Sequence, residues 1–259
     1  MRFSANLGFL WADRPLPDAI HAAKAAGFDA VECHWPYDTP ASDIKAALEA
    51  TGLPMLGLNT QRGDVAGGEN GLSALTGRTD EARDAISQAV EYANIIDAAA
   101  IHVMCGFASG AQAHDTFVDN LRFACEATDR TILIEPLNRH DAPGYFLQTT
   151  DQARAIIAEV ARPNLKLMFD CYHVGRTEGD ITTRLTDLAD IIGHIQFASV
   201  PDRGAPDHGE LDYAHIFATL SDWPAPLGAE YKPGGDTDAT LGWLADFRDQ
   251  GGQSKDPVS

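Results

Sequence analysis

The chain has 259 residues, of which 44% are apolar, and 38 acidic against 19 basic residues give it a formal charge of −19. This length and composition suit one domain with a large core. The negative charge would repel phosphate backbones and anionic membranes, so we expect no nucleic acid and no membrane surface as a partner.

The four cysteines form no Cys-x-x-Cys pair, which is typical of reduced thiols and indicates a cytoplasmic location. We expect no export signal or membrane span, because there is no long apolar h-region and no run of about eighteen apolar residues.

Strand-like and helix-like patterns alternate from the start of the chain. The first strand is expected over residues 3–7, and a helical pattern follows over 17–26, with Gly27 as its stop. The same alternation then repeats along the rest of the sequence. The remaining expected strands cover 30–34, 55–59, 101–105, 132–135, 167–170, 194–196 and 227–230, and the remaining expected helices cover 42–50, 81–97, 112–128, 151–160, 182–191, 213–220 and 237–247.

Eight strands that alternate with eight helices favour a parallel sheet closed into a (β/α)₈ barrel over an open doubly wound sheet. The open alternative would carry a Gly-x-Gly-x-x-Gly turn after its first strand, whereas Leu7-Gly8-Phe9-Leu10 follows here, and no Walker A loop occurs. We therefore expect no nucleotide cofactor. The barrel is expected to be one domain over 1–248, with a flexible tail over 249–259. The glycine-rich connection 60–78 is longer than the usual two to six residues, which indicates either a lid or an insertion without a role.

Four short apolar runs in the second half of the chain each end in a polar residue that can bind a metal ion. These residues are spaced 26 to 35 positions apart, about the repeat of a strand, a loop, a helix and another loop. Barrel active sites lie at the carboxyl ends of the strands, so the four oxygens could converge there. An all-oxygen set is preferred by Mg²⁺ or Mn²⁺, whereas Zn²⁺ more often draws on His or Cys. The expected ligands are Glu135, Asp170, Gln196 and Glu230.

The predicted cation site suits a substrate with neighbouring hydroxyl and carbonyl groups. Both oxygens could occupy the two open positions of an octahedral ion, which would make the carbon-bound proton between them more acidic. Glu135 and Glu230 come from strands three apart around the ring, so they could flank the substrate. One would take a proton from one carbon and the other would return it to the neighbouring carbon. The predicted reaction is an aldose–ketose isomerisation.

Further residues near the same strand ends are candidate substrate-binding groups. Arg203 and Lys232 could attract a carboxylate on the substrate, which the residual negative charge of the cation site would otherwise oppose. His173 follows the second expected ligand by three residues, and Asn6 and Glu32 end the first two strands and point towards the mouth. Three other histidines are interpreted as packing or hydrogen-bonding residues: His34, His102 and His194.

Motifs spread from the first expected strand to the last helix carry a family likeness. They are Phe3-Ser4-Ala5-Asn6-Leu7, Gly27-Phe28-Asp29-Ala30-Val31-Glu32, Pro36-Tyr37-Asp38, Gly63-Asp64, Gly77-Arg78, Ile134-Glu135-Pro136, Asp170-Cys171-Tyr172-His173, Gly209-Glu210-Leu211-Asp212-Tyr213 and Glu230-Tyr231-Lys232-Pro233. Together they resemble the hydroxypyruvate isomerases, which are xylose-isomerase-like barrels. The resemblance implies Mg²⁺ on the four strand-end residues and proton exchange by the two glutamates. It also implies interconversion of hydroxypyruvate and tartronate semialdehyde through a cis-enediolate.

Departures from the family pattern leave alternatives open. The stretch Glu135-Pro136-Leu137-Asn138-Arg139 also resembles ketose 3-epimerases, which offer a His where Gln196 stands, and 2-oxo-tetronate isomerases share much of the remaining pattern. His34-Trp35, Thr76 and Gly8-Phe9-Leu10-Trp11 could reshape the pocket. Outside enzymes, the alternative is a sugar-acid-binding protein. A metal-dependent nuclease would need a basic face and a His-rich zinc cluster. Barrels of this superfamily often associate, so a homo-oligomer is left open.

Overall fold

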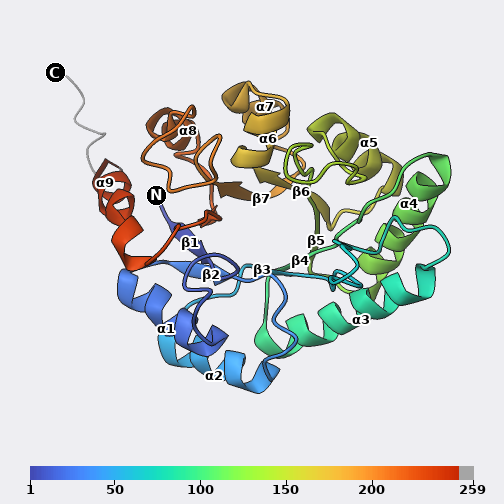
Figure 1. The fold of residues 1–259 in the computed structure, drawn as a ribbon, viewed down its shortest axis with the longest axis horizontal. Coiled ribbons are helices and arrows are strands. Elements are labelled where there is room, and N and C mark those ends of the chain that lie inside the picture. Colours follow the sequence, from blue (N-terminus) through green and yellow to red (C-terminus); the bar gives the residue numbers. More distant parts are fainter. Residues whose placement is uncertain (251–259) are drawn as a thin grey trace.

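A ring of eight parallel strands forms the centre of the molecule, in the order β2-β1-β8-β7-β6-β5-β4-β3 (Figure 1). The computed structural model describes residues 1–250. A parallel bridge joins Val31 of β2 to Met55, two residues before β3 begins, so the barrel is nearly closed. The predicted (β/α)₈ fold is confirmed. The strands are β1 (Phe3–Asn6), β2 (Ala30–Glu32), β3 (Gly57–Asn59), β4 (Ala100–His102), β5 (Thr131–Ile134), β6 (Leu165–Asp170), β7 (Ile192–Phe197) and β8 (Leu227–Ala229).

Helices surround the barrel, and their number exceeds the prediction. An extra helix follows β6 without a loop, because Asp170 caps it: its Oδ1 accepts the Tyr172 N–H at 2.8 Å. The last predicted helix is split in two, and its second part extends beyond 248, the predicted domain end. The rest of the predicted tail lies outside the described residues. The helices are α1 (Leu16–Ala26), α2 (Ala41–Thr51), α3 (Thr79–Ile96), α4 (Ala111–Ala127), α5 (Thr150–Val160), α6 (Cys171–Thr177), α7 (Ile181–Asp187), α8 (Tyr213–Thr219), the 3₁₀ helix η1 (Asp238–Thr240) and α9 (Gly242–Gln250).

The alternation of side chains along each strand separates the main core from the barrel interior. In β6, Leu167 and Phe169 join the large core between the sheet and the helices, while Met168 belongs to a separate small cluster with Leu133 and Ala100 of neighbouring strands. Successive strand residues point to opposite faces. Residues two positions beyond the interior cluster, such as Asp170, therefore also face the inside of the barrel, at its mouth.

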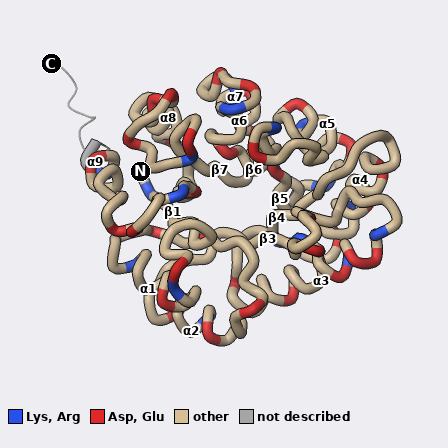
Figure 2. Tube along the Cα trace, in the orientation of Figure 1, with Lys and Arg blue, Asp and Glu red and all other residues tan. Residues whose placement is uncertain are grey.

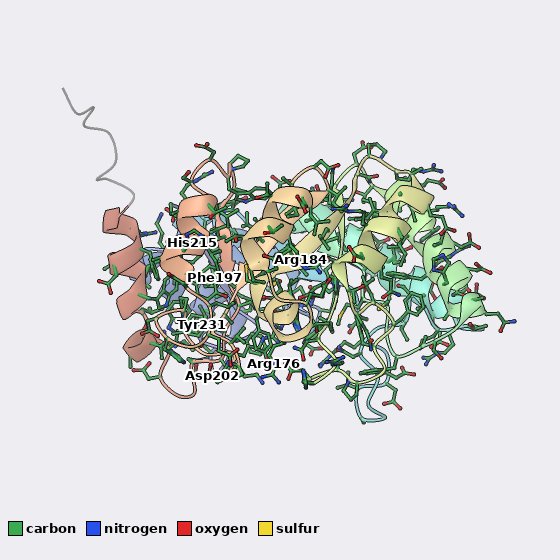
Figure 3. The ribbon with its side chains drawn as sticks, turned by 90° about the horizontal axis from the view of Figure 1, so that it is seen from above. Arg176, Arg184, Phe197, Asp202, His215 and Tyr231 are labelled. Carbon is green, nitrogen blue, oxygen red and sulfur yellow. The ribbon has the colours of Figure 1, made fainter. Side chains whose placement is uncertain are left out.

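An aromatic cluster supports the strands that carry the last two expected ligands. The Phe3 ring packs edge-on against Phe197, Phe217 and Trp243, with ring centroids 5.2 to 5.8 Å apart. Each such pair adds about 0.5–1.5 kcal/mol beyond its buried area. Figure 3 labels Phe197 of this cluster, and it labels Asp202 and Arg176 close together, near the loop that follows β7. There the Arg176 guanidinium donates to the Pro201 carbonyl at 3.0 Å.

The long glycine-rich connection after β3 is attached to the neighbouring strand end along its second half. Leu72 and Ser73 each donate an N–H to the Met104 carbonyl at 3.2 Å. Gly71 lies so close to this segment that an added Cβ would stand 2.6 Å from the Gly106 nitrogen, and its φ of 122° also favours glycine. Any lid movement would therefore be confined to the first half of the loop. Its role as a lid stays a prediction.

Acidic residues lie on helices all around the ring (Figure 2). Among the helices of the described part of the chain, none combines the length and the hydropathy that crossing a bilayer requires.

Candidate active site

The four expected ligands lie on four consecutive strands at one end of the barrel. Glu135 directly follows β5, Asp170 ends β6, Gln196 is the last but one residue of β7, and Glu230 directly follows β8. Asp170 and Gln196 are register partners across the β6–β7 pair. All four residues are only 1% to 6% exposed. The structure thus gathers the predicted set at a single buried mouth.

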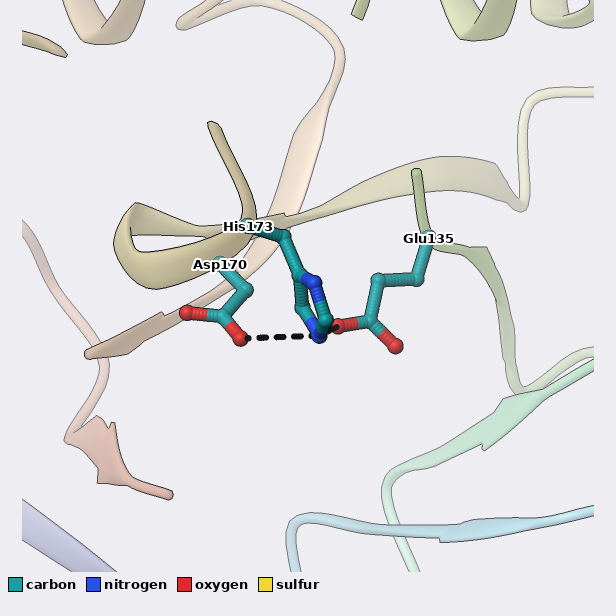
Figure 4. Close-up of side chains that lie close together, drawn as sticks. All are labelled: Glu135, Asp170 and His173. Carbon is teal, nitrogen blue, oxygen red and sulfur yellow. Dashed lines mark ion pairs between the residues drawn. The ribbon is translucent and has the colours of Figure 1, made fainter. Parts of the chain in front are cut away.

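Two of these acids form a tight cluster with the histidine of α6. Glu135, Asp170 and His173 each offer an atom within 4.8 Å of one another (Figure 4). The His173 Nε2 lies 3.6 Å from Asp170 Oδ2 and 3.8 Å from Glu135 Oε1. A buried group of this composition could hold a metal ion.

Three of the expected ligands carry a buried oxygen that has no hydrogen-bond partner within residues 1–250. These atoms are Glu135 Oε1, Asp170 Oδ2 and Gln196 Oε1. Each buried acceptor left unsatisfied costs about 1–3 kcal/mol, and native proteins contain few of them. Three such oxygens at one barrel mouth match the needs of a divalent cation. The residues therefore fit Mg²⁺ or Mn²⁺.

The acids of the cluster differ in their proton affinity. Burial, together with the charge of Glu230, raises the pKa of Asp170 to about 7. Burial and the charges of Glu230 and Asp170 also raise the pKa of Glu135 well above its ordinary value. For Glu230, burial would raise the pKa, but Arg203 and His34 outweigh it and lower the pKa to about 2. The metal-free cluster therefore contains one ionised glutamate beside acids that retain protons more readily.

Arg203 supplies the buried positive charge of this mouth. Its Nη2 lies 2.9 Å from Glu230 Oε2 and 3.6 Å from Asp170 Oδ2. The guanidinium also stands over two rings, with Cζ 4.8 Å from the Phe9 centroid and 5.0 Å from that of Tyr172. These cation–π contacts help to hold the guanidinium beside the two acids. The predicted place of Arg203 at the site agrees with this geometry.

His173 presents an N–H to the cluster. Its Nδ1 accepts the Asn138 backbone N–H at 3.0 Å, so the ring proton of the neutral form sits on Nε2, which faces the acids. Burial, followed by the charge of Arg203, lowers the pKa of His173 to about 3, and the ring is neutral near pH 7. A nitrogen that carries a proton is a hydrogen-bond donor and not a metal ligand. The arrangement therefore favours substrate binding over metal ligation.

Asn6 and Glu32 end β1 and β2 and are hydrogen-bonded to each other. The Glu32 Oε1 accepts from Asn6 Nδ2 at 3.0 Å and from Gln196 Nε2 at 2.8 Å. Its Oε2 is 2.5 Å from the His194 Nε2. Asn6 and Glu32 are 1% and 4% exposed, respectively. Glu32 thus contacts Gln196, one of the expected ligands, and Asn6 contacts Glu32.

Lys232 is not brought into the cluster. Its side chain is exposed, and within residues 1–250 its ammonium group forms no hydrogen bond or ion pair. Only its backbone N–H is engaged, donating to the Arg203 carbonyl at 2.7 Å. A role in substrate binding would therefore require the side chain to reach in from the rim.

Two histidines interpreted as packing or hydrogen-bonding residues border the site directly. The His34 Nε2 is 2.7 Å from Glu230 Oε1. The His102 Nδ1 lies 3.7 Å from Glu135 Oε2, and in the described part of the chain both buried His102 nitrogens have no hydrogen-bond partner. Their position at or near the ends of β2 and β4 was the sequence signal that could have placed them at the site, because strand ends form the mouth of a barrel.

Comparisons with known proteins show the family of this chain. Residues 20–247 match the model of the xylose isomerase-like TIM barrel family. This chain belongs to that family. It is 43% identical to the 2-oxo-tetronate isomerase of Cupriavidus necator, over 95% of this chain and 98% of the relative. It is 38% identical to the hydroxypyruvate isomerase of Escherichia coli strain K12, over 96% and 100% of the two chains. The predicted resemblance is confirmed, and the protein is an enzyme of the isomerase class.

Solved structures show the same architecture. A protein from Brucella melitensis described as an AP endonuclease of family 2 superposes with a TM-score of 0.90 at 36% identity, covering 95% of this chain and 98% of that chain. A D-allulose 3-epimerase from Methylomonas sp. superposes with a TM-score of 0.79 at 19% identity, covering 96% of each chain. At that identity the second likeness concerns the fold alone.

Proposed function

We propose that this isomerase acts on a small hydroxycarbonyl acid and depends on Mg²⁺ or Mn²⁺ held by Glu135, Asp170, Gln196 and Glu230. The supporting observation is the set of buried oxygens without partners on three of these residues. The proposed reaction is hydroxypyruvate to tartronate semialdehyde. The isomerisation of 2-oxo-tetronate is a second candidate, favoured by the 43% identity to a protein of that name.

In the proposed reaction the two glutamates move the carbon-bound proton. When bound, the cation would make the proton on the hydroxyl-bearing carbon, next to the carbonyl, more acidic. One of Glu135 and Glu230 removes it, leaving a cis-enediolate. The hydroxyl proton moves to the former carbonyl oxygen, and the other glutamate returns a proton to the neighbouring carbon, so that the two functional groups exchange places. The Nε2–H of His173 faces the same space and can donate to a substrate oxygen. Arg203 beside Glu230 keeps that carboxylate ionised.

The substrate is proposed to carry a carboxylate. Arg203 already lies within the mouth, and Lys232 stands at its rim. A charge-assisted hydrogen bond to a carboxylate is roughly twice as strong as a neutral one.

The acidic surface supports a small-molecule substrate over nucleic acid (Figure 2). The four buried free thiols support a reducing compartment such as the cytoplasm.

Deuterium labelling tests the proposed reaction. The protein, freed of metal and reloaded with Mg²⁺ or Mn²⁺, is incubated in D₂O with C3 and C4 hydroxycarbonyl acids and with a neutral ketose. Proton NMR then follows the two adjacent carbons. We expect turnover of the acids, with label entering or hydrogen moving between those carbons. Product formation with neither exchange nor transfer would exclude the proton-transfer mechanism, and turnover of the neutral ketose alone would favour an epimerase.

A further inference from the structure

We propose that Glu32 is a positioning residue that orients the side-chain amide of Gln196 so that its oxygen faces the cation site. This inference rests on the proposed metal centre and goes beyond it. It also replaces the expectation that Glu32 binds substrate.

Both carboxylate oxygens of Glu32 are engaged by protein side chains. One carboxylate oxygen accepts from the amides of Gln196 and Asn6, and the other meets His194 at 2.5 Å. The Asn6 amide is held in turn, because its Oδ1 accepts the Gly8 N–H at 2.9 Å. Glu32 is therefore a fixed acceptor that three side chains surround.

A fixed carboxylate decides which way an amide points. The two ends of a glutamine amide have nearly the same shape but opposite hydrogen-bonding character, so its partners set the orientation. Glu32, when ionised, only accepts, and the Gln196 NH₂ must face it, as the 2.8 Å contact shows. The Gln196 Oε1 is then turned away, where it is buried without a partner. The opposite orientation would present NH₂ to the cation and remove one ligand.

The strand next to this pair leaves room for both side chains. Gly228 of β8 is the register partner of Gln196. A Cβ at Gly228 would stand 2.7 Å from Glu32 Oε1 and 2.9 Å from Gln196 Cγ. Any larger residue there would push the two apart. The close contact between Glu32 and Gln196 thus depends on glycine at position 228.

Exchanging the two residues tests orientation separately from packing. In the single variant Glu32→Gln, residue 32 can donate as well as accept, so the Gln196 amide loses its fixed direction. In the double variant Glu32→Gln with Gln196→Glu, the carboxylate at 196 presents an oxygen in either direction, and the amide at 32 can donate to it. The exchange keeps the charge and the shape of the pair.

The measurement is Mn²⁺ affinity by calorimetry on metal-free protein, with thermal unfolding as the folding check. We expect Glu32→Gln to weaken Mn²⁺ binding about 10- to 100-fold, the usual effect of losing a partner that orients a ligand. We expect the exchanged pair to recover most of that loss. The matched control is Glu178→Gln, because the Glu178 side chain is also buried, at 7% exposed, but pairs with Arg184. It should leave Mn²⁺ affinity unchanged.

The outcomes separate this inference from the proposed function. Absence of Mn²⁺ and Mg²⁺ binding by the unmodified protein would overturn the metal centre and the inference together. Unchanged affinity in a folded Glu32→Gln protein would overturn the inference alone. Weakened binding that the exchanged pair fails to recover would show that Glu32 only supports the fold. If Glu32→Gln does not fold, the exchanged pair decides: near-normal affinity supports orientation, and a folded protein without binding refutes it.

Discussion

The buried carboxylates on two sides of the barrel mouth differ in whether their oxygens have hydrogen-bond partners. On the side of β5 and β6, Glu135 and Asp170 each keep an oxygen without a partner. On the side of β2, Glu32 is equally buried, yet both of its oxygens are engaged. Burial alone therefore does not distinguish a ligand from a supporting residue. Among these three carboxylates, an oxygen without a partner distinguishes the proposed ligands from Glu32. Glu230, the remaining acidic residue of the proposed ligand set, has its two oxygens engaged by His34 and Arg203.

The largest expected effect comes from neutralising the two proposed proton-transfer residues. Glu135→Gln and Glu230→Gln should each lower kcat by about 10²- to 10⁴-fold, the usual contribution of a general acid or base. Steady-state kinetics with a C3 and a C4 hydroxycarbonyl acid measures this. The control is Glu178→Gln, which changes a buried carboxylate away from the mouth and should keep near-normal kcat. Equal losses in all three variants would remove the distinction between the two sides of the mouth.

His173 offers the next test, because it borders both unsatisfied acids. If its Nε2 is a donor to the substrate, His173→Gln should lower kcat/KM by about 10- to 100-fold, the loss of a hydrogen bond to a charged or polarised oxygen. Mn²⁺ affinity should change little. A collapse of Mn²⁺ affinity in calorimetry would instead make His173 a ligand and contradict the tautomer set by Asn138.

The raised pKa values of Glu135 and Asp170 predict how the metal-free site responds to pH. The folded protein retains protons that the unfolded chain has already released, so its stability should fall as pH rises from about 5 through about 7. Mn²⁺ must displace these protons, and its affinity should be on the order of tenfold weaker at pH 6 than at pH 8.

Thermal unfolding at pH 6, 7 and 8, with and without Mn²⁺, checks both statements. We expect added Mn²⁺ to raise Tm most at pH 8. In Asp170→Asn, calorimetry in buffers of different ionisation enthalpy should show fewer protons released on binding. Metal affinity that does not vary with pH would mean that the acids of β5 and β6 are ionised before the cation arrives.

The smallest expected effect concerns the rim. Lys232→Met should raise KM for a carboxylate substrate about fivefold, corresponding to about 1 kcal/mol, because an exposed charge is screened by water. A neutral ketose should show no change. Kinetics with the acid and the ketose side by side measures the difference. An unchanged KM for the acid would leave Arg203 as the proposed cation for the carboxylate.

Much of the site could be predicted because strand ends in a parallel barrel share one mouth. The spacing of Glu135, Asp170, Gln196 and Glu230 was enough to place them on consecutive strands. The helix α6 was missed because it begins directly at the end of β6, where Asp170 both ends the strand and caps the helix. A sequence pattern that assumes a loop between a strand and the next helix does not predict such a junction.

Local sequence thus determined the barrel, its single mouth and the group of polar residues that gathers there, since strand periodicity and repeat length are properties of neighbouring residues. Only the tertiary structure decided which of those residues have hydrogen-bond partners for their side-chain oxygens. Glu32 and Gln196 are 164 positions apart in the chain, and closure of the ring brings them into contact. Hydrogen-bond partners across a barrel depend on that closure, so the difference between a free and an engaged carboxylate appears only in the folded molecule.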